Sequence, residues 1–546
     1  MKWMAALAAA AGFLAASGRA AAAQSVDLRI VSTTDVHGRI RGWDYFADTA
    51  ESARGLARVA TIVDSVRRVI PGGTILLDAG DFLQGNPLTY VASRPDAKGP
   101  HPVVAAMNVM RYDAVVLGNH EFNYGLPALD RMLAGAKFPA IAANVARSDG
   151  HPGWPGVAWI EREGVRIAVI GETTQWATIW DKLNLEGKVT IGDIVASVRA
   201  RADSARRAGA DVVIVLAHSG LDGGSGQGDH TAGLPPENVM AEVARQVPGV
   251  DLIVFGHTHR EVADTTVHGV LLVQPRNWAA SASVVAMRLE RDGAGWRVAS
   301  KRGTIVRAAG HPEAPAVVAA VEAAHVAARA WANTVIGSTA VAWRTDSART
   351  TDTPIIDFIG ETMRRATGAD LASTAVFSTN VRMPAGPITV SRLAQLYPYD
   401  NTIRVLRLSG AQLKAFLERS AEYYKVSGEG AAAVAAPDPA FIGFNFEVVT
   451  GASYDIDLRR PRGDRIVGLS VRGRAVAATD SFNVALSNYR ASGTGGYGMV
   501  VGAPLVTDDQ REVRQLLIDE VTRRKTLRPA DYYTRSWRLL PPALAT

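Results

Sequence analysis

The chain has 546 residues, of which 47% are hydrophobic and 21% charged, and its formal net charge is +6. A chain of this length and composition can bury more than one core, which excludes a disordered or fibrous protein. The absence of cysteine excludes disulfides, thiolate metal sites and cysteine nucleophiles, and the mild positive charge suits a small anionic substrate better than a nucleic acid polymer.

The first residues have the pattern of a secretory signal. Lys2 gives a basic start, an apolar stretch follows, and the segment ends in an Ala-x-Ala run before Gln24. The alternative is a membrane anchor, but the apolar stretch is short and the residues SGR at 17–19 interrupt it. We therefore predict a signal peptide at residues 1–23 and an exported protein, periplasmic or secreted, without a membrane anchor.

The rest of the first half alternates apolar, strand-like runs with helical patterns. The strand-like runs are VDLRIVSTTD, GTILLDAGD, DAVVLGNHE, VRIAVIGE, DVVIVLAHSG and DLIVFGHTH. Strands that alternate with helices indicate βαβ units and an α/β fold whose helices cover the sheets. An Ala-rich stretch with a proline near its start then predicts a linker helix, after which a new alternation begins. We predict a first domain at residues 24–310, a linker helix at 311–335 and a second domain at 336–546.

Polar side chains follow the first-half strands at their carboxyl ends. Five strands end in this way, and five of the chain's 11 histidines lie there. A single histidine near a strand end would be read as structural. So many in one pattern indicate a shared site, because an open α/β sheet presents its chemistry at this edge. The residues are Asp35, His37, Asp81, Asn119, His120, His218, His257 and His259.

This set offers the nitrogen and oxygen ligands that Zn, Mn, Fe or Co prefer, in sufficient number for two divalent metal ions. Two close ions need a shared carboxylate, and Asp81 is central in the strand order, so we predict that it is the bridge. His120 is left to donate a proton to a leaving oxygen as a general acid. Asp78 and Glu121 are expected to support the site without binding metal. We expect the two ligand groups to be Asp35, His37 and His259 for one ion, and Asn119, His218 and His257 for the other.

The motifs TTDVHG, GDFLQG, GNHEFNYG, AHSG and GHTH resemble the five motifs of the calcineurin-like metallophosphoesterases. Beyond the signal segment, the whole chain resembles the two-domain nucleotidase branch of that superfamily. The resemblance implies an N-terminal αββα sandwich of two sheets with a dinuclear metal centre, a linker helix and a C-terminal 5′-nucleotidase-type α/β domain. It also implies hydrolysis of phosphate esters, because metal binding lowers the pKa of water toward neutrality and two ions stabilise the attacking and leaving oxygens.

One position departs from the 5′-nucleotidases. These enzymes usually read H-E-F-D, with the aspartate paired to the catalytic histidine, whereas here Asn123 stands three residues after His120. We therefore predict His120 and Asn123 as the catalytic residues of this motif, with an amide in the place of the family's carboxylate.

The second half resembles the family's substrate-binding domain. The segments LYPYDN and LSNYRASGTGGYG are similar to the two that clamp a nucleobase, which implies Tyr399 and Tyr489 on its two faces. Stacking of this kind tolerates several bases and contributes ~1–3 kcal/mol. Arg382 and Asn488 match family positions near the nucleoside or phosphate. The alternative is that both tyrosines are core residues.

The loop after Tyr489 bears on which ester is cut. In 5′-nucleotidases it commonly reads GGDG, and the aspartate accepts the ribose hydroxyls, whereas here it reads GTGG with Gly495 in that position. A carboxylate there would repel a phosphate on the 2′ or 3′ oxygen, so its absence permits such substrates. The segments DYFAD, GLARVAT, HPVVAAMN and DTPIIDF also resemble the exported 2′,3′-cyclic-nucleotide 2′-phosphodiesterase/3′-nucleotidases. We therefore expect 2′,3′-cyclic nucleotides to be opened to 3′-nucleotides, which are then dephosphorylated.

Three other functions fit parts of the pattern. A 5′-nucleotidase or UDP-sugar hydrolase would keep the same metals and differ only in substrate orientation. A non-catalytic nucleotide-binding protein would explain the base clamp, but it would not need seven ligands and a further histidine. A sulfur-compound hydrolase on the same scaffold would need no base clamp.

Overall fold

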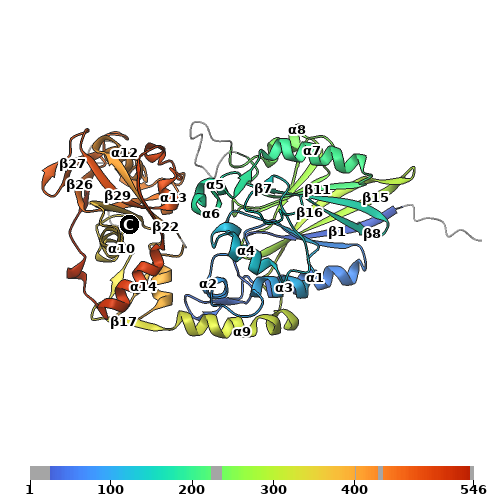
Figure 1. Ribbon diagram of the computed structural model, residues 1–546, viewed down its shortest axis with the longest axis horizontal. Helices are drawn as coiled ribbons and strands as arrows, with labels where there is room; N and C mark the ends of the chain where they lie inside the picture. The colour runs from blue at the N-terminus through green and yellow to red at the C-terminus, as the bar shows by residue number, and fades with distance from the viewer. Residues whose placement is uncertain (1–24, 223–235, 400, 428–433, 542–546) are drawn as a thin grey trace, which may run out of the picture.

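Two α/β domains joined by a long helix make up the described part of the chain (Figure 1). The computed structural model describes residues 25–222, 236–399, 401–427 and 434–541. The predicted signal peptide at residues 1–23 lies outside the described residues.

The N-terminal domain contains two six-stranded sheets. The first has the order β16 (Gly295–Arg307), β15 (Ser281–Asp292), β1 (Ser25–Thr33), β4 (Thr74–Asp78), β5 (Ala114–Val116) and β6 (Ala140–Ile141). The second has the order β13 (Val262–Val267), β14 (Val270–Gln274), β12 (Leu252–Phe255), β11 (Val212–His218), β9 (Val165–Thr173) and β8 (Val157–Arg162). Strands β1, β4, β5 and β6 run parallel to one another, as do β9, β11, β12 and β14. Parallel neighbours bring their carboxyl ends to the same edge of each sheet.

The two sheets pack face to face and helices cover their outer faces. Strands β4 and β11 are buried along their whole length, which explains their mostly apolar sequences, since a strand covered on both sides has no polar face. Ile30, Leu77 and Leu216 belong to the core between the sheets. Figure 1 shows the layers, with α1 (Leu56–Val69) and α3 (Pro102–Met110) on the first sheet and α7 (Ile194–Arg207) and α8 (Met240–Gln246) on the second. The predicted αββα sandwich is confirmed.

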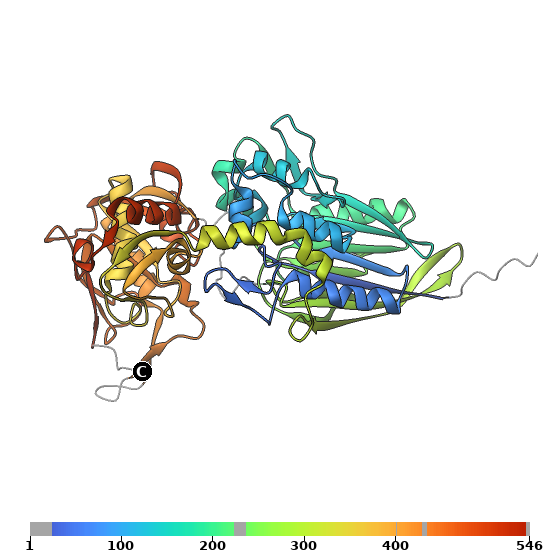
Figure 2. The same cartoon turned by 90° about the horizontal axis from the view of Figure 1, so that it is seen from below.

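Helix α9 (Pro315–Ala332) joins the domains and runs from one to the other in Figure 2. Its proline occupies the first turn, where a missing N–H costs no hydrogen bond. Val317 and Val321 pack into the core beneath the first sheet. His325, also buried in this helix, has its Nδ1 2.8 Å from the Tyr45 hydroxyl. The linker helix therefore packs as a part of the N-terminal domain.

The predicted domain bounds at 24–310, 311–335 and 336–546 stay predictions. The nearest changes in structure are the end of β16 at Arg307 and the start of β17 (Val335–Thr339) at Val335, with α9 between them.

The C-terminal domain contains a five-stranded sheet with the order β25 (Glu447–Thr450), β19 (Leu371–Ala375), β29 (Ser481–Ser487), β22 (Thr402–Ser409) and β30 (Leu505–Glu512). A four-stranded sheet has the order β28 (Arg474–Ala475), β27 (Ile466–Val471), β26 (Ala452–Asp457) and β32 (Trp537–Leu540). One large apolar core includes residues of both sheets and of the helices α10 (Pro354–Thr367), α12 (Gly410–Ala421) and α14 (Val513–Arg524). This separate core makes the second half a domain in its own right.

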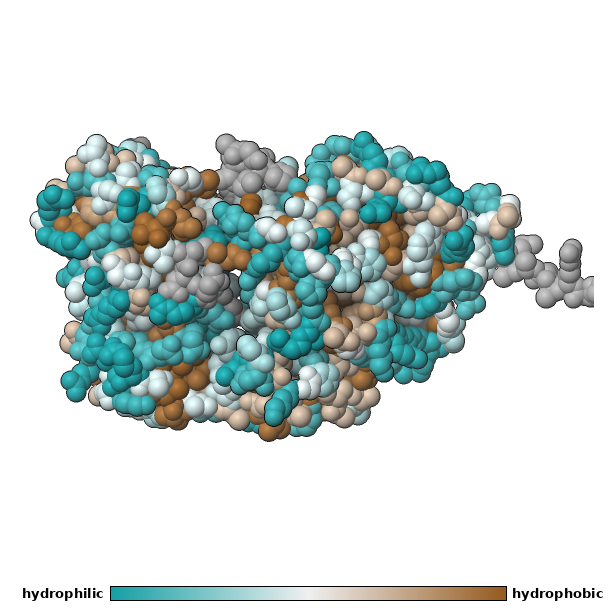
Figure 3. All heavy atoms as spheres, viewed as in Figure 1, coloured by the Kyte–Doolittle hydropathy of each residue, from teal (hydrophilic) through white to brown (hydrophobic). Residues whose placement is uncertain are grey.

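The apolar residues lie mostly inside these cores. On the face drawn in Figure 3, hydrophilic residues predominate and hydrophobic ones are scattered among them. None of the helices in the described ranges combines the length and the apolar composition that a bilayer span requires.

Candidate metal centre and interdomain cavity

The turns that follow the parallel strands bring the predicted ligands together. Asp35 and His37 follow β1, Asp81 follows β4, and His218 ends β11, while His257 and His259 follow β12. Six of these side chains form two groups, and within each group the potential ligand atoms lie within 4.8 Å of one another. The groups are Asp35, His37 and His259, and Asp81, His218 and His257.

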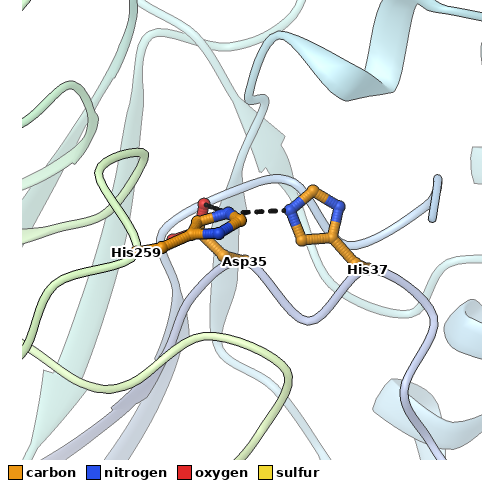
Figure 4. Close-up of side chains that lie close together, drawn as sticks. All are labelled: Asp35, His37 and His259. Carbon is orange, nitrogen blue, oxygen red and sulfur yellow. Dashed lines mark hydrogen bonds and ion pairs between the residues drawn. The ribbon is translucent and has the colours of Figure 1, made fainter. Parts of the chain in front are cut away.

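In the first group the imidazoles point their Nε2 atoms at each other (Figure 4). The Nε2 atoms of His37 and His259 are 3.1 Å apart, and the His259 Nε2 is 3.3 Å from Asp35 Oδ1. His37 donates its Nδ1–H to the backbone carbonyl of Gln84 at 2.8 Å, which leaves the Nε2 lone pair to face His259. Burial lowers the pKa of His37 to about 3, so this imidazole is neutral, as a metal ligand must be.

The second group is built in the same way around Asp81. Its Oδ2 is 2.9 Å from His218 Nε2, and the His218 Nε2 is 3.3 Å from His257 Nδ1. His218 donates its Nδ1–H to the carbonyl of Ala79 at 2.7 Å, and the remaining ring nitrogen of His257 bonds to Glu237 at 2.5 Å. The outward nitrogens are therefore tied to protein acceptors, and the inward ones converge.

Glu237 orients His257, and sequence reasoning did not identify this residue. It follows residues 223–235, which are not described, and no strand-end pattern marks it. The sequence alone predicts a solvated residue for a glutamate shortly before an apolar helix. Only the structure shows that Glu237 contacts His257.

The backbone at these residues adopts a conformation that residues other than glycine seldom take. The φ angle is positive at 48° for Asp35, 46° for His37, 59° for Asp81, 76° for His257 and 55° for His259. Such conformations cost of order 1–3 kcal/mol each and persist where the surrounding structure imposes them, chiefly at functional sites. Five of the seven predicted ligands share this feature, which indicates a preorganised site.

The donor set fits two divalent cations. Asn119 is buried, and its Oδ1 has no hydrogen-bond partner among the described residues, an unfavourable state that a nearby cation would relieve. Burial alone would lower the pKa of His218, but the charge of Asp81 outweighs it and raises the pKa to about 10. The carboxylate therefore favours a positive charge at this place. The assignment of Asp81 as a bridge stays a prediction.

Glu121 and Asp78 support the site from behind. The Glu121 carboxylate is fully buried and accepts the backbone N–H groups of Gly118, Asp81, Phe82 and Leu83 at 2.7–3.0 Å. Burial raises the pKa of Glu121 to about 7, and these backbone bonds oppose the rise. Asp78 accepts hydrogen bonds from the Thr33 hydroxyl at 2.5 Å and the Gly80 N–H at 3.0 Å. Both carboxyl groups thus accept hydrogen bonds from the protein itself.

The predicted acid His120 has an unexpected set of neighbours. Its Nδ1 is 2.6 Å from Asn123 Oδ1, and Asn123 Nδ2 is 3.0 Å from each carboxylate oxygen of Asp181. Burial raises the pKa of Asp181 to about 6, while the hydrogen bond from Asn123 lowers it. Asp181 lies 58 residues after Asn123 in the chain and was not predicted from the sequence.

A cavity of about 360 Å³ lies between the two domains. Its N-terminal wall includes Asp81, Asn119, His120, Asn123, His257 and His259. Its C-terminal wall includes Phe377, Tyr399, Asn401, Phe444, Asn488 and Tyr489. The metal-side residues and both predicted clamp tyrosines therefore face one space, which is of the size expected for a small-molecule site.

The other two predicted substrate residues, Asn488 and Arg382, lie in different places. Asn488 lines the cavity and donates its Nδ2–H to the carbonyl of Trp180 at 3.1 Å, across the domain interface. Arg382 is not among the cavity-lining residues, and its exposed side chain lies 3.6 Å from Asp346. The structure thus does not bring Arg382 to the site.

Trp180 contacts the second domain at this interface through its side chain and its backbone carbonyl. It ends α5 (Ala177–Trp180) and donates its indole N–H to the Thr494 hydroxyl at 3.1 Å. Its ring stacks on the imidazole of His257, with centroids 5.6 Å apart and planes at 29°. One side chain therefore contacts both a predicted metal ligand and the loop of the second domain.

Gly495 has a structural reason to be glycine. Its φ is +83°, and a Cβ atom there would overlap Arg490 Nη1 and lie 2.5 Å from Asn445 Oδ1. Arg490 is buried and forms an ion pair with Glu447 at 2.8 Å, and Glu447 lines the cavity. A carboxylate is thus present on this wall, but it is neutralised by the arginine that fills the space beside Gly495.

Comparison with known proteins gives the same picture. Residues 28–261 match the calcineurin-like phosphoesterase family and residues 335–502 match the 5′-nucleotidase C-terminal domain. A 2′,3′-cyclic-nucleotide 2′-phosphodiesterase/3′-nucleotidase of Salmonella typhimurium is 32% identical, over 97% of this chain and 91% of its own length. The trifunctional nucleotide phosphoesterase protein YfkN of Bacillus subtilis is 30% identical over 95% of this chain. The match covers only 39% of the length of that protein.

A solved structure is also similar along the whole chain. It is a Staphylococcus aureus protein described as a 5′-nucleotidase, in complex with α-ketoglutarate, and it is 26% identical with a TM-score of 0.80. The match covers 94% of this chain and 100% of that one. The chain therefore belongs to the family of phosphoester hydrolases that join a calcineurin-like phosphoesterase domain to a 5′-nucleotidase C-terminal domain.

Proposed function

We propose that the protein hydrolyses 2′,3′-cyclic nucleotides to 3′-nucleotides and 3′-nucleotides to nucleoside and phosphate. The observation that carries the proposal is the interdomain cavity, which has members of both ligand groups and His120 on one wall and Tyr399 and Tyr489 on the other. A phosphate at the first wall and a base at the second fit one nucleotide. The name of the Salmonella relative supports this choice of ester.

The site would hold two divalent ions, of Zn, Mn, Fe or Co type. Bound there, the ions would supply positive charge to the phosphate and lower the pKa of water. The ligands would be Asp35, His37 and His259 for one ion and Asn119, His218 and His257 for the other, with Asp81 shared.

The remaining roles fall to residues of the chain alone. His120 would donate a proton to the leaving ribose oxygen, which is a poor leaving group without it. Tyr399 and Tyr489 would hold the base by stacking and so fix which ribose edge faces the ligands. Asn488 would help to orient the nucleoside. Arg382 does not line the cavity and is left without a role in the arrangement seen here.

The charge of the cavity wall that would face the ribose favours substrates with a phosphate on the 2′ or 3′ oxygen. No side chain extends from Gly495, and the Glu447 carboxylate is paired with Arg490. An ionised phosphate on the 2′,3′ edge would therefore meet no free carboxylate from this pair.

A phosphate-release assay with 2′,3′-cyclic AMP, 3′-AMP and 5′-AMP tests the proposal on metal-loaded protein. We expect 5′-AMP to be poorer by about tenfold or more, equivalent to ~1.4 kcal/mol in the barrier. A preference for 5′-AMP over both others would instead support a 5′-nucleotidase, the function named for the Staphylococcus aureus structure.

We also propose that the protein is exported to the periplasm or secreted. The residue pattern of the first 23 positions supports this location. Expression of the full chain followed by fractionation and N-terminal sequencing tests it, with cleavage near Gln24 as the expected result.

A further inference from the structure

The turn that contains Asp181 holds the turn that contains His120. Asp181 precedes α6 (Lys182–Leu185), and its buried carboxylate accepts both contacts from the Asn123 amide nitrogen. Three residues on, Asn184 donates its amide to the backbone carbonyls of Phe122 at 3.0 Å and Asn123 at 3.1 Å. The Asp181 turn therefore uses two side chains to bind both a side chain and the backbone of the His120 turn.

These contacts fix the orientation of the Asn123 amide. An ionised carboxylate only accepts hydrogen bonds, so the NH2 end of Asn123 must face Asp181 and the oxygen must face His120. The oxygen in turn requires a proton on the His120 Nδ1, 2.6 Å away. His120 is thereby held with its Nε2 available to a group in the cavity that it lines.

We propose that Asp181 is a positioning residue for the general acid, which it holds through Asn123. The proposal rests on the proposed function, in which His120 protonates the leaving oxygen. When the bond between phosphorus and that oxygen breaks, the His120 imidazolium passes its Nε2 proton to the oxygen. The other proton stays on His120 Nδ1, hydrogen-bonded to the Asn123 oxygen, so that a neutral imidazole remains and Asp181 stays ionised. The negative charge that H-E-F-D sequences place beside the histidine lies here one amide group further away.

The variant Asp181→Asn tests the charge with little change of shape. Without an obligate acceptor, the Asn123 amide can rotate and His120 loses its fixed tautomer. We expect turnover of 3′-AMP to fall by about 30-fold, part of the 10²–10⁴-fold that a general acid contributes. Turnover of p-nitrophenyl phosphate should fall by less than about threefold, because p-nitrophenolate leaves without a proton.

The matched control is Glu186→Gln, which removes one negative charge from an exposed position just beyond α6. Its side chain pairs with Lys182 and, within the described part of the chain, does not hydrogen-bond to Asn123, so both substrates should keep their wild-type rates. A general loss of charge in this segment is thereby separated from loss of the Asp181 carboxylate.

A charge exchange gives a result that a merely structural role would not produce. Asn123→Asp alone places two carboxylates about 3.0 Å apart and should be slow with 3′-AMP. The double variant Asn123→Asp/Asp181→Asn restores one carboxylate and one amide, with the carboxylate now next to His120. We expect it to recover the wild-type rate with 3′-AMP to within about threefold, a strong coupling between the two positions.

Equal slowing of both substrates in Asp181→Asn, or a double variant no faster than the single ones, would overturn the inference. A wild-type protein inactive on all nucleotides would instead overturn the proposed function. In that event, phenyl phosphate against p-nitrophenyl phosphate gives the same comparison of a poor with a good leaving group, so Asp181 is tested either way. Circular dichroism and metal content of each variant identify any loss of fold.

Discussion

The two walls of the cavity are held in place by different means. On the N-terminal wall the ligand residues stand on sharp turns after buried strands, five of them with positive φ, and Glu121 binds four backbone N–H groups beneath them. On the C-terminal wall Tyr399 is 41% exposed and its contacts include an edge-on ring contact with Phe377. The first wall is determined by its backbone and the second by side chains.

This difference separates two kinds of effect. A change in the ligands of the N-terminal wall should affect every phosphate ester, because all of them must meet the same ligands. A change on the C-terminal wall should affect only substrates that carry a base. A nucleotide and a phosphate ester without a base, such as p-nitrophenyl phosphate, therefore distinguish a change in the metal ligands from a change in the base clamp.

The largest effect is expected from Asp81→Ala. Asp81 bonds to His218 and accepts the backbone N–H of His120 at 2.8 Å. Its loss therefore removes a ligand and also a hydrogen bond that positions His120. Metal charge stabilisation is worth several kcal/mol, which corresponds to about a thousandfold loss for nucleotides and p-nitrophenyl phosphate alike. Rate measurements and elemental analysis check this, with the exposed Asp64→Ala as control. Two tightly held metals and a normal rate would contradict the assignment.

A smaller effect, dependent on the leaving group, is expected from His120→Ala. The side chain donates no proton after the change, while the backbone bond of residue 120 to Asp81 remains. We expect about a hundredfold loss with 3′-AMP and a much smaller loss with p-nitrophenyl phosphate. If steady-state rates fell equally for the two substrates, His120 would have a role other than that of an acid.

On the other wall, Tyr489→Ala should weaken nucleotide binding alone. Base stacking is worth ~1–3 kcal/mol, so we expect KM for 3′-AMP to rise about tenfold or more, with p-nitrophenyl phosphate unaffected. Tyr533→Ala is the control, because Tyr533 is a half-exposed tyrosine of the same domain that does not line the cavity. An equal change for both substrates would mean that the tyrosine supports the fold and not the base.

The sequence predicted the N-terminal wall because its chemistry follows the strands. Each ligand stands just after an apolar run, and parallel strands bring such positions to one edge. Asp181 and Glu237 escaped prediction because they lie on connecting segments, and Asp181 acts on a residue 58 positions away. The tyrosines were found only by family resemblance, since no periodic pattern marks them. Gly495 was read as a missing charge, whereas Arg490 fills its surroundings.

The smallest effect is expected where the two walls touch. Thr494→Val keeps the size of the side chain but removes the acceptor of the Trp180 indole N–H. A hydrogen bond contributes ~1 kcal/mol, so the contact between the domains should weaken and kcat/KM for 3′-AMP should fall about fivefold. The rate with p-nitrophenyl phosphate should stay the same, because it needs no base clamp. Ser492→Ala is the control, since it removes the hydroxyl that contacts Thr494 at 2.8 Å and donates to the Tyr489 carbonyl at 2.7 Å, and leaves the Trp180 bond intact. Equal losses for Thr494→Val and Ser492→Ala would show that Trp180 does not link the walls.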